Sequence, residues 1–578
     1  FHYLFTRKLT EYAVIWILLM VAIGCLVLGL IFGLSNDVDG SIGAIASNAV
    51  GCAEIGGQML DVGGSAADAA IATMLCEGVM LPHSLGVGGG FVATIYSKET
   101  GQVETLIARE TAPAAATRDM FVHAGEHVTG ALSCAVPSEI FGYWKLHERL
   151  GKLPWRALFE PTIELCRNGI TVSLYLAGVL ANHEEHIKQE LSMSEIFINP
   201  DTQRVYREGE IMYRRVLADT LEIIATEGAE VLYRGGRVGR MLVEDIQEMG
   251  GIITEQDLQS YDVRWEEPLR SSFGHGYELY TTPLPTSGAL LIFIVNVMDK
   301  LYTPNMQIET YWHRLVESFK HAYGHRTNLG DLHFEPSVWP LYRELIDPQF
   351  ADEMRALIQD DVTFEDPQYY GANFSNVEDH GTAHISVLAP NGDAISVTST
   401  INGHLGARVR SRQTGFILND EMDDFSTPGR VNAYGIPASP ANYIKPGKRP
   451  MSSTCPSIVL DKQGNVQLIV GGAGGSKITT SVAQAILRYF VLKESVYNAV
   501  NSGRLHHQLA PMHVELEPSV SRRTAAHLER IGHKLSYLPA HKAYSALTAI
   551  GSKESVPDPI CDYRREGSAV LVGPSLDY

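Results

Sequence analysis

The chain has 578 residues, of which 45% are hydrophobic and 19% are charged, and its formal net charge at pH 7 is −20. This composition is ordinary for a globular protein, and the length suits several domains or one large α/β enzyme. The negative charge argues against nucleic acid as a partner, because binding to a phosphate backbone depends on Lys and Arg.

The first predicted element is an apolar helix near the N-terminus. Residues 12–34 carry no charge and are long enough to cross a hydrocarbon core of about 30 Å. Basic residues precede this segment and acidic residues follow it, so the positive-inside rule places residues 1–11 in the cytoplasm. The alternative is a cleaved signal peptide, but the segment is longer than the usual apolar region and no clear cleavage site ends it. We expect a single-pass type II protein of the plasma membrane, with an extracellular ectodomain and further cytoplasmic residues before Phe1.

The rest of the chain divides into a helical part and a β-rich part. Residues 46–81 are rich in small side chains and predict closely packed helix, and glycines at 86–90 precede a predicted strand at 91–96. Charged helical stretches alternate with short apolar runs up to about residue 361, and β-prone runs with Gly and Asn turns follow. Asn373 stands in the one Asn-x-Ser/Thr sequon, which predicts a glycosylation site on an extracellular domain.

A first predicted hairpin brings hydroxyl side chains together. β-prone runs at 383–387 and 394–398 flank an Asn-Gly turn, which is the strongest short-range hairpin signal. Antiparallel pairing about this turn places Thr382 opposite Thr400 to within about one residue, where facing Cα atoms are about 4.5–5.5 Å apart. Asn402 lies just beyond, at the same end of the hairpin.

A second predicted hairpin ends at a glycine-rich turn. Two β-prone runs within residues 458–470 fold back on each other and set Ser452 and Ser453 against Gly474 and Gly475. The backbone N–H groups of such a turn can form an anion or oxyanion site. Either hairpin alone is explained by an ordinary hairpin with polar ends, and the convergence of the two favours a functional site.

Several segments partly match known nucleotide-binding or zinc-binding motifs but lack their defining residues. The glycine-rich turn lacks the Gly-Lys-Ser/Thr ending of a phosphate-binding loop, and the glycines at 86–90 are followed by Phe91, where a dinucleotide fingerprint needs Gly. His183 and His186 lack the spacing and the third ligand of a zinc site. No Gly-x-Ser-x-Gly motif is present. These absences argue against a nucleotide or metal enzyme.

One family pattern connects segments along nearly the whole ectodomain. At 379–384 the sequence reads Asp-His-Gly-Thr-Ala-His, and the other matching segments are 63–70, 86–90, 108–110, 398–402, 419–425, 446–453 and 474–475. In this order and spacing they resemble the gamma-glutamyl transpeptidase (glutathione hydrolase) family, in its animal membrane-bound type. The segment at 379–384 resembles the junction at which members of the family cleave themselves.

The resemblance implies an α/β (α+β) fold, a four-layer αββα sandwich of the N-terminal-nucleophile hydrolase type, here preceded by one transmembrane helix. It implies a precursor cut between Gly381 and Thr382 into a large subunit, 35–381, and a small catalytic subunit, 382–578, which stay together as a heterodimer. A hydroxyl is a poor nucleophile unless a base takes its proton. The cut gives Thr382 a free α-amine, whose ordinary pKa of about 7.7–8.0 leaves a neutral fraction at physiological pH. One cut thus supplies both nucleophile and base.

The resemblance also implies a role for each residue of the site. Thr382 attacks the γ-carbonyl of the donor, Thr400 orients Thr382, and the N–H groups of Gly474 and Gly475 stabilise the oxyanion. The α-carboxylate of the donor is held by Arg109, Ser452 and Ser453, and its α-ammonium by Asn402, Glu421 and Asp424. Without the resemblance, the acidic turn at 420–424 is better explained as a solvated surface turn.

The implied donors are glutathione and other γ-glutamyl compounds, and the γ-glutamyl group passes to water or to the amine of an amino acid or dipeptide. No metal or organic cofactor is needed. A disulfide between Cys52 and Cys76 is implied by a pair in the animal enzymes. Two departures from the family pattern are His404, which replaces an aromatic residue and would change the donor pocket wall and acceptor choice, and the lack of a cysteine pair at 191–200.

Three alternatives stay open at this point. A related amidase acting on cephalosporin side chains or poly-glutamate would share Thr382 and the fold, but the complete donor-binding set favours a free γ-glutamyl donor. A family member that prefers leukotriene C4 fits the same residues. A catalytically silent ectodomain, serving as receptor or scaffold, is a different class. Silent relatives usually lose the nucleophile or the donor-binding residues, and this chain keeps both.

Overall fold

The computed structural model describes residues 42–125, 128–375, 381–431, 437–539, 545–553 and 556–573. Residues Ile42–Val572 form one compact unit. The predicted anchor at 12–34 and the predicted cytoplasmic residues 1–11 lie outside the described residues. Within the described part of the chain, no helix is both long and apolar enough to cross a membrane.

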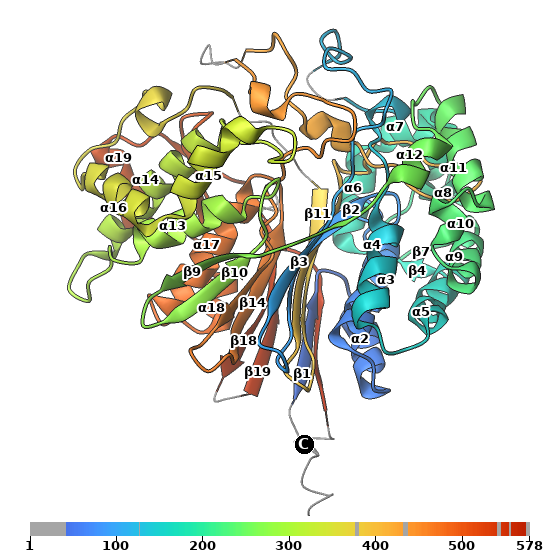
Figure 1. The fold of residues 1–578 in the computed structure, drawn as a ribbon, viewed down its shortest axis with the longest axis horizontal. Helices are drawn as coiled ribbons and strands as arrows, with labels where there is room; N and C mark the ends of the chain where they lie inside the picture. The colour runs from blue at the N-terminus through green and yellow to red at the C-terminus, as the bar shows by residue number, and fades with distance from the viewer. Residues whose placement is uncertain are drawn as a thin grey trace, which may run out of the picture. The chain divides into compact units, whose positions relative to one another are not determined.

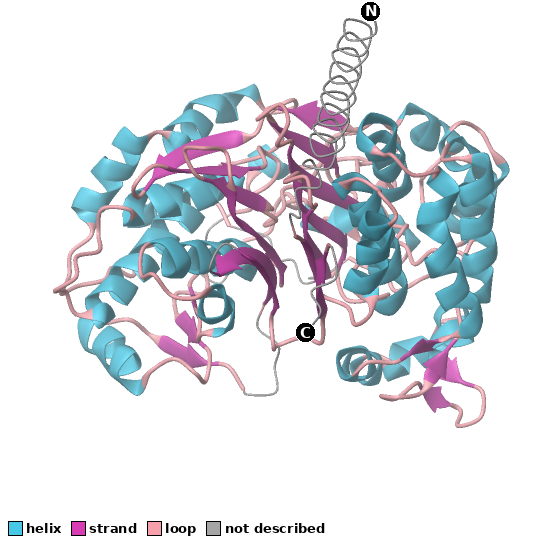
Figure 2. Ribbon diagram, turned by 90° about the horizontal axis from the view of Figure 1, so that it is seen from below, coloured by secondary structure: helices cyan, strands magenta, loops and turns pink. Residues whose placement is uncertain are grey.

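Two antiparallel sheets face each other at the centre of the compact unit (Figure 1, Figure 2). The first sheet has seven strands, in the order β20 (Ser568–Val572), β1 (Gly43–Ser47), β11 (Gly381–Leu388), β12 (Ala394–Asn402), β2 (Gly90–Tyr96), β3 (Val103–Ala108) and β8 (Arg264–Glu266). The second has six, in the order β19 (Val556–Cys561), β18 (Ala546–Lys553), β14 (Val466–Ala473), β13 (Ser457–Leu460), β10 (Tyr277–Thr281) and β9 (Leu269–Phe273). Strands from distant parts of the sequence therefore lie side by side in both sheets.

Helices cover the outer face of each sheet, and Figure 1 shows the two helical layers on opposite sides of the strands. The layer beside the seven-stranded sheet contains α2 (Cys52–Asp61), α3 (Ala66–Met80), α4 (Glu139–Leu150), α5 (Trp155–Asn168), α6 (Leu174–Asn182), α7 (Glu184–Gln189), α8 (Leu191–Phe197), α9 (Arg215–Glu227), α10 (Glu230–Tyr233), α11 (Arg237–Glu248) and α12 (Glu255–Ser260). The other layer contains α13 (Gly288–Met298), α14 (Ile308–Arg326), α15 (Trp339–Ile346), α16 (Pro348–Leu357), α17 (Lys477–Phe490), α18 (Val496–Asn501) and α19 (Arg522–Ile531). The layer order is helices, sheet, sheet, helices, as the family resemblance implies.

Short elements complete the fold. Minor sheets are formed by β15 (Leu505–His506), β16 (Val514–Leu516) and β17 (Leu535–Tyr537), by β4 (Ile170–Thr171) with β7 (Ile211–Met212), and by β5 (Ile198–Asn199) with β6 (Arg204–Val205). The 3₁₀ helices are η1 (Ala131–Ser133), η2 (Pro336–Val338), η3 (Pro367–Tyr370), η4 (Glu421–Asp424) and η5 (Pro440–Asn442). Of these, η4 contains two of the predicted donor-binding residues.

Separate apolar cores hold the layers together. One lies between the seven-stranded sheet and its helices, and another between the six-stranded sheet and its helices. Helix α13 has no polar face because all its residues are buried between the second sheet and neighbouring helices, which explains its nearly continuous apolar sequence. A smaller apolar cluster lies between the sheets and includes Ala46, Ala394, Ile458 and Ile469. Both sheets contribute to this cluster, as expected where two inner faces interdigitate.

The region predicted as helix at 46–81 is only partly helical. It starts in strand β1, continues through α2 and α3, and turns between these helices at glycines. Ser65 caps α3 and forms a reciprocal capping box with Asp68. Cys52 at the start of α2 is joined to Cys76 in α3 by a disulfide, the pair that the resemblance implies. The predicted strand at 91–96 is present as β2.

Both hairpins form as predicted from their turns. In the first, β11 pairs with β12, and Ala389 N donates to Asp393 O at 2.8 Å across the turn. Gly381 pairs with Asn402 and Ala383 with Ser399, so an irregularity in the ladder surrounds Thr382. In the second, β13 pairs with β14 around the predicted turn. The register therefore places Thr382 beside Thr400, within the predicted one-residue tolerance.

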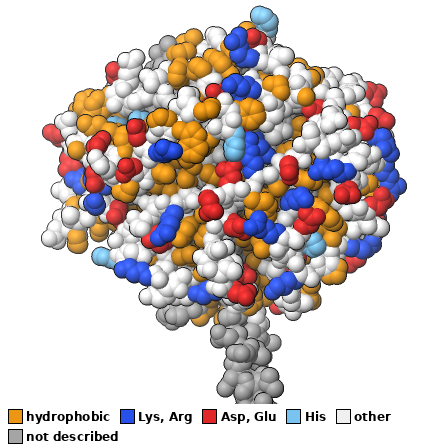
Figure 3. All heavy atoms as spheres, in the orientation of Figure 1, with side chains coloured by type: hydrophobic (Ala, Val, Ile, Leu, Met, Phe, Trp, Pro, Cys, Tyr) orange, Lys and Arg blue, Asp and Glu red, His pale blue; other side chains and the backbone are white. Residues whose placement is uncertain are grey.

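The surface carries charges of both signs. Figure 3 shows acidic and basic side chains interspersed over the face seen in Figure 1. The face shown in Figure 3 therefore lacks the continuous basic stripe that nucleic-acid binding requires, in keeping with the net charge of −20.

Candidate active site

The hydroxyl of Thr382 lies against the peptide that precedes it. In the uncut chain, Thr382 Oγ1 donates to the carbonyl of Gly381, and Thr400 Oγ1 donates to the same oxygen. The two hydroxyl oxygens are 3.5 Å apart, and Thr400 Oγ1 also accepts from Asn402 N at 2.8 Å. All three side chains are buried, with 4 to 6% of their surface exposed. One carbonyl is thus contacted by two hydroxyl groups.

Glycine at position 381 is required by the neighbouring strand. A Cβ on Gly381 would lie 2.2 Å from the carbonyl oxygen of Asn402. Asn402 itself has a φ of +69°, in the left-handed region that Asn adopts more readily than most residues. This local geometry turns the end of β12 toward Gly381 and holds the Gly381–Thr382 peptide close to Thr400.

Two side chains hold β11 on its other edge, beyond the end of β1. Arg565 Nη1 donates to the carbonyl of Thr382 at 2.9 Å, and Asn48 Oδ1 accepts from the backbone N–H of His384 at 2.9 Å. The ladder between β1 and β11 ends at Ser47 and Ile385. Arg565 and Asn48 therefore replace the missing strand and fix the backbone on both sides of Ala383.

His384 follows Thr382 by two residues, and it lies buried between the sheets. Its Nδ1 is hydrogen-bonded to Thr398 Oγ1 at 2.8 Å, and its Nε2 contacts the hydroxyls of Ser396 and Ser386 at 3.3 and 3.4 Å. Burial lowers the pKa of His384 to about 3. His384 is therefore neutral at physiological pH and is too weak a base to deprotonate a hydroxyl.

Contacts between the sheets bring the glycine turn to the same end as Thr382. Gly471 lies directly against the ring of His384, and Ser396 Oγ donates to the carbonyl of Val470 at 3.2 Å. Following these strands from the contacts, β14 runs toward Gly474 as β12 runs toward Thr400. The predicted oxyanion turn and the hydroxyl pair therefore lie at the same end of the two sheets.

Gly471→Ala is expected to destabilise the fold by about 1–3 kcal/mol, as overpacking usually does. The added Cβ would lie 2.2 Å from the His384 ring, which is fixed by its hydrogen bonds. The midpoint of denaturant unfolding measures this effect. Gly178→Ala in α6 is the matched control, because its Cβ would meet no atom within 4 Å. Equal midpoints for Gly471→Ala and the unmodified chain would contradict the close contact.

The turn after β14 has the backbone geometry of an anion-binding loop. Gly474 and Gly475 have φ values of +121° and +61°, which favour glycine. Their carbonyls accept from Lys477 N and Ile478 N at 3.3 and 2.9 Å, which begins helix α17. Within the described residues, the N–H groups of both glycines donate no hydrogen bond. They are thus available to a ligand at the start of a helix.

The predicted donor-binding residues converge on Arg109. Arg109 Nη1 lies 2.8 Å from Glu421 Oε2, and Arg109 Nη2 forms an ion pair with Asp424. The same guanidinium donates to the carbonyls of Pro450 and Met451 at 3.2 and 3.3 Å. Ser452 and Ser453 follow directly in the chain. The resemblance assigns Arg109 and the two carboxylates to opposite ends of a donor, and in this structure they pair with one another.

Asparagine and aspartate side chains fix the backbone around this cluster. Asn402 Nδ2 donates to the carbonyl of Asp420 at 3.1 Å, and Gly403 N donates to Asp420 Oδ1 at 2.7 Å. Asn419 Oδ1 accepts from Glu421 N at 3.1 Å, while Asn442 Nδ2 donates to the carbonyl of Asp424 at 2.7 Å. These bonds connect the end of β12 to η4, so the hydroxyl pair and the carboxylates share one rigid frame.

Burial governs the charges in this cluster. Burial raises the pKa of Asp420 to about 8 and also raises the pKa of Glu421, a rise that Arg109 opposes. For Arg109, burial lowers the pKa, but attraction to Glu421, Asp424 and Glu110 outweighs it and raises the pKa above its ordinary value. Arg109 therefore keeps its charge in a site where carboxyl groups are expensive to ionise.

The remaining sequence predictions lie in different places. Ser453 Oγ accepts from Arg326 Nη2 at 3.3 Å, and Ser452 Oγ lies 3.1 Å from Thr454 Oγ1. His404 Nε2 contacts the hydroxyl of Tyr175 at 3.2 Å. Asn373 is exposed at the surface and donates to Asn328 Oδ1 at 3.1 Å. Of the predicted junction, Asp379 and His380 lie outside the described residues.

Among the described residues, one group has the composition of a metal site: His313, Glu317 and His533. Its members already bond to one another and to other groups. His313 Nδ1 is 2.9 Å from His533 Nε2, its Nε2 contacts the carbonyl of Gln359 at 2.7 Å, and Glu317 accepts from Tyr370 at 2.7 Å. A closed hydrogen-bond network explains this cluster without an ion.

Sequence reasoning missed the residues that hold Thr382 from across the fold. Arg565 is 183 positions away in the sequence and reaches Thr382 only because β20 and β1 lie beside β11. Asn48 follows β1 for the same reason, and Asn442 connects Asp424 with Met451. No local pattern marks these positions. A prediction of strand order would have been needed to find them.

The fold has two central sheets between two helical layers, and the Thr382 hydroxyl lies at the start of β11. This arrangement defines a class, a mixed α/β fold of the N-terminal-nucleophile hydrolase type. The cephalosporin acylase structure from Bacillus halodurans shares this fold, with a TM-score of 0.79 and 22% identity, covering 92% of this chain and 96% of that chain. The gamma-glutamyltranspeptidase structure from Helicobacter pylori has a TM-score of 0.50 and 30% identity, over 54% of this chain and 90% of that chain.

The chain belongs to the gamma-glutamyltranspeptidase family, whose model matches residues 52–572. Scoloptoxin SSD14 of Scolopendra dehaani is 42% identical over 91% of each chain. Glutathione hydrolase 2 of Arabidopsis thaliana is 40% identical over 81% of each chain, and the glutathione hydrolase 5 proenzyme of Mus musculus is 36% identical over 91% of this chain and 92% of the relative. The chain is thus an enzyme of the gamma-glutamyltransferase and glutathione hydrolase kind.

Proposed function

We propose that the chain cleaves itself between Gly381 and Thr382 and then transfers γ-glutamyl groups from glutathione and its conjugates to water, amino acids or dipeptides. The observation that carries this proposal is the contact of the Thr382 hydroxyl with the carbonyl of Gly381. A nucleophile beside its own preceding carbonyl is placed to attack that peptide before it attacks any substrate.

In the proposed first step, Thr382 Oγ adds to the Gly381 carbonyl carbon. The C–N bond then breaks, the Thr382 nitrogen takes up the proton that Thr382 Oγ releases, and Gly381 becomes an ester on the Thr382 oxygen. Thr400, which donates to the Gly381 carbonyl, stabilises the negative oxygen that forms there. Water hydrolyses the ester and leaves a carboxylate on Gly381 and a free α-amine on Thr382.

The freed amine is the proposed base for every later turnover. His384 is excluded from this role by its low pKa and by the hydrogen bonds of both ring nitrogens. Arg565 and Asn48 hold the backbone after the cut, so the new terminus keeps its place beside Thr400. Thr382 Oγ then attacks the donor's γ-carbonyl, with Gly474 and Gly475 N–H groups on the oxyanion.

Donor binding is proposed to exchange one set of ion pairs for another. In this structure Arg109 pairs with Glu421 and Asp424. A γ-glutamyl donor brings a carboxylate for Arg109, Ser452 and Ser453, and an ammonium for the two carboxylates and Asn402. The charges of the zwitterion therefore take the place of internal partners of the same sign, which limits the cost of burying them.

The proposal includes the subunits and the location expected from the sequence. The cut would give a large subunit, 35–381, and a small subunit, 382–578. The anchor at 12–34 would hold the enzyme on the outer face of the plasma membrane, with glycosylation at the exposed Asn373. Relatives named proenzymes support a processed precursor.

Denaturing gel electrophoresis, N-terminal sequencing and a glutathione assay test this function together. The purified protein should give two fragments, the smaller beginning Thr-Ala-His, and should release glutamate from glutathione. Adding glycylglycine should divert part of the γ-glutamyl group to a new peptide. A single intact chain with no glutathione turnover would instead support the silent receptor or scaffold.

Arg109→Lys is expected to raise KM for a γ-glutamyl anilide by about tenfold or more, with a smaller change in kcat. A lysine ammonium cannot bond Glu421 and Asp424 from two nitrogens while also reaching the Pro450 carbonyl. Steady-state kinetics measure the split. Arg118→Lys is the control, because Arg118 is exposed and, among the residues the structure describes, forms an ion pair with its neighbour Asp119. An unchanged KM would contradict the proposed role of Arg109.

A further inference from the structure

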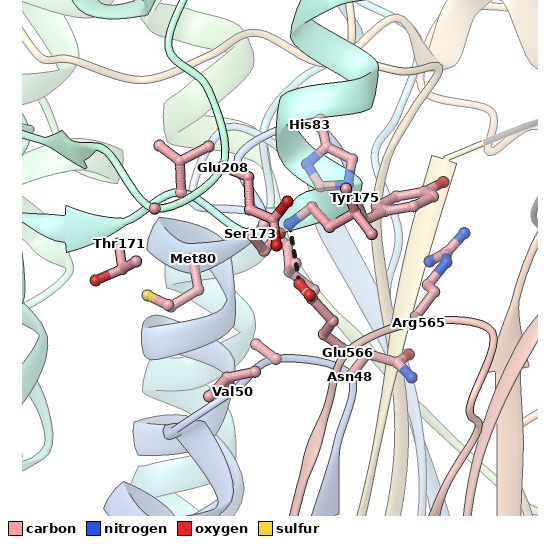
Figure 4. Close-up of a pocket in the computed structure, with 15 residues that line it drawn as sticks. Asn48, Val50, Met80, His83, Thr171, Ser173, Tyr175, Glu208, Arg565 and Glu566 are labelled. Carbon is pink, nitrogen blue, oxygen red and sulfur yellow. Dashed lines mark hydrogen bonds between the residues drawn. The ribbon is translucent and has the colours of Figure 1, made fainter.

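A cavity of about 260 Å³ lies on the edge of β11 opposite to Thr400. It is formed between the end of β1, helix α3, the segment before α6 and the loop before β20. Figure 4 shows Arg565 and Tyr175 on one side and Met80 and Thr171 on the other. None of the residues assigned to the donor lines this cavity. Among the residues that line it, Arg565 and Asn48 are hydrogen-bonded to the backbone of β11.

Arg565 is a buried cation that forms no ion pair with a carboxylate of the described residues. Its side chain is 6% exposed, and its one hydrogen bond within the described residues goes to the carbonyl of Thr382. Its Nε has no partner there, and its guanidinium lies 4.8 Å from the centre of the Tyr175 ring. The interior carboxyl that interacts with it is Glu77, whose pKa burial raises to about 8, so Glu77 is largely uncharged at neutral pH. A buried cation in this state is costly unless an anion reaches it.

His83 gives a second, independent sign of a missing ligand. It is fully buried and lines the cavity, and neither ring nitrogen has a hydrogen-bond partner in the described part of the chain. Burial lowers the pKa of His83, and His404, Arg565 and His183 lower it further. The ring is therefore neutral and has one N–H to donate, beside the cationic Arg565.

The rest of the cavity wall is mainly apolar. Met80, Leu81 and Val172 form much of it, and Val50 lies toward the outside with 53% of its surface exposed. Two exposed carboxylates, Glu208 and Glu566, also line the cavity, and Glu566 accepts from Leu174 N at 3.1 Å. A bound molecule would therefore meet positive charge at the inner end and apolar surface along its body.

We propose that this cavity binds a small organic carboxylate with an apolar body, its carboxylate on Arg565 and His83. The ligand supplies the anion that Arg565 lacks and an acceptor for the His83 N–H. Its body covers the apolar wall, which a chloride or sulfate ion would leave uncovered. The site is coupled to Thr382, since the guanidinium that would hold the ligand also holds the Thr382 carbonyl. This link to Thr382 bears on turnover only through the proposed function, whereas the binding of the carboxylate does not depend on that function.

Binding of benzoate to the full, processed chain tests the site without using activity. Calorimetry should show saturable binding of benzoate and about tenfold or weaker binding of benzamide, which has the same body and no charge. Val50→Trp, which fills the outer part of the cavity from an exposed position, should weaken benzoate binding by about tenfold. Arg109→Lys should leave it unchanged, because that substitution alters the donor site. Benzoate binding that is lost in Arg109→Lys and kept in Val50→Trp would overturn the proposal.

The rim charge gives a variant that should strengthen binding. Glu208→Lys removes a carboxylate and adds a cation at the cavity, so benzoate affinity should rise by about threefold at low salt and less at high salt. Glu353→Lys on α16 is the matched control, because it makes the same charge change in the opposite helical layer and should leave the affinity unchanged. Equal effects of the two variants would mean a general charge effect and would contradict the site.

The binding of inorganic anions distinguishes a site for an organic carboxylate from a general anion site. Sulfate and chloride should bind more weakly than benzoate and should be insensitive to Val50→Trp. If sulfate binds as tightly as benzoate with the same sensitivity, the cavity is an inorganic anion site and the organic carboxylate is wrong. If no anion binds while glutathione is still turned over, the site is wrong and the proposed function stands.

Discussion

Thr382→Ala is expected to yield one uncut chain without measurable hydrolysis of a γ-glutamyl anilide, a loss of at least about four orders of magnitude. The substitution removes the oxygen that contacts the Gly381 carbonyl, so neither the cleavage nor the later attack on a donor has a nucleophile. Denaturing electrophoresis shows the first loss, and release of the anilide chromophore shows the second. Normal cleavage in this variant would remove Thr382 from the proposed mechanism.

Thr382→Ser is the matched control for this result. Serine keeps the hydroxyl and loses only a methyl group from a side chain that is 4% exposed. The chain should still be cut into two fragments, and hydrolysis should persist at a reduced rate. If Thr382→Ser behaved like Thr382→Ala, loss of folding rather than loss of the nucleophile would explain both variants.

Thr400→Val is expected to slow self-cleavage by about 10²–10³-fold, the usual effect of removing one donor from an oxyanion. Valine keeps the shape of threonine and removes the hydroxyl that donates to the Gly381 carbonyl. It also leaves Asn402 N without its acceptor, which loosens the end of β12. The rate is measured by following conversion of freshly made precursor into two fragments over time.

Thr398→Val separates this role from a general effect of losing a hydroxyl on the same strand. Thr398 bonds the His384 ring and does not contact Gly381, so its loss should lower stability while cleavage goes on at nearly the normal rate. Equal slowing by Thr398→Val and Thr400→Val would contradict a specific role for Thr400. Thr398 and Thr400 lie two residues apart on β12, so comparing the two variants tests which of these hydroxyl groups assists the cleavage.

The hairpins that carry the site were predictable because their signals are local. An Asn-Gly turn between β-prone runs fixes both partners and nearly fixes their register, which placed Thr382 beside Thr400. The helical prediction for 46–81 was less accurate because small residues suit any close-packed element. Strand β1 lies between two other strands and is fully buried, so it shows no alternation that would mark it as a strand.

The contacts that cross the layers were beyond sequence reasoning. The pairing of Arg109 with Glu421 and Asp424 joins residues more than 300 positions apart, and the resemblance had assigned them to opposite ends of a substrate. Arg565 and Asn48 reach β11 only because of strand order. Such contacts depend on how whole layers stack, and no window of the sequence contains that information.

The strand order has a consequence for the two proposed fragments. In the seven-stranded sheet, β11 and β12 of the small fragment lie between β1 and β2 of the large one, and β20 of the small fragment lies on the far side of β1. The six-stranded sheet is also shared, with β9 and β10 from the large fragment beside β13 from the small one. Pulling the fragments apart would break several backbone ladders and expose three cores at once. Dilution alone should therefore not separate them under native conditions, even though no peptide bond would join them after the cut.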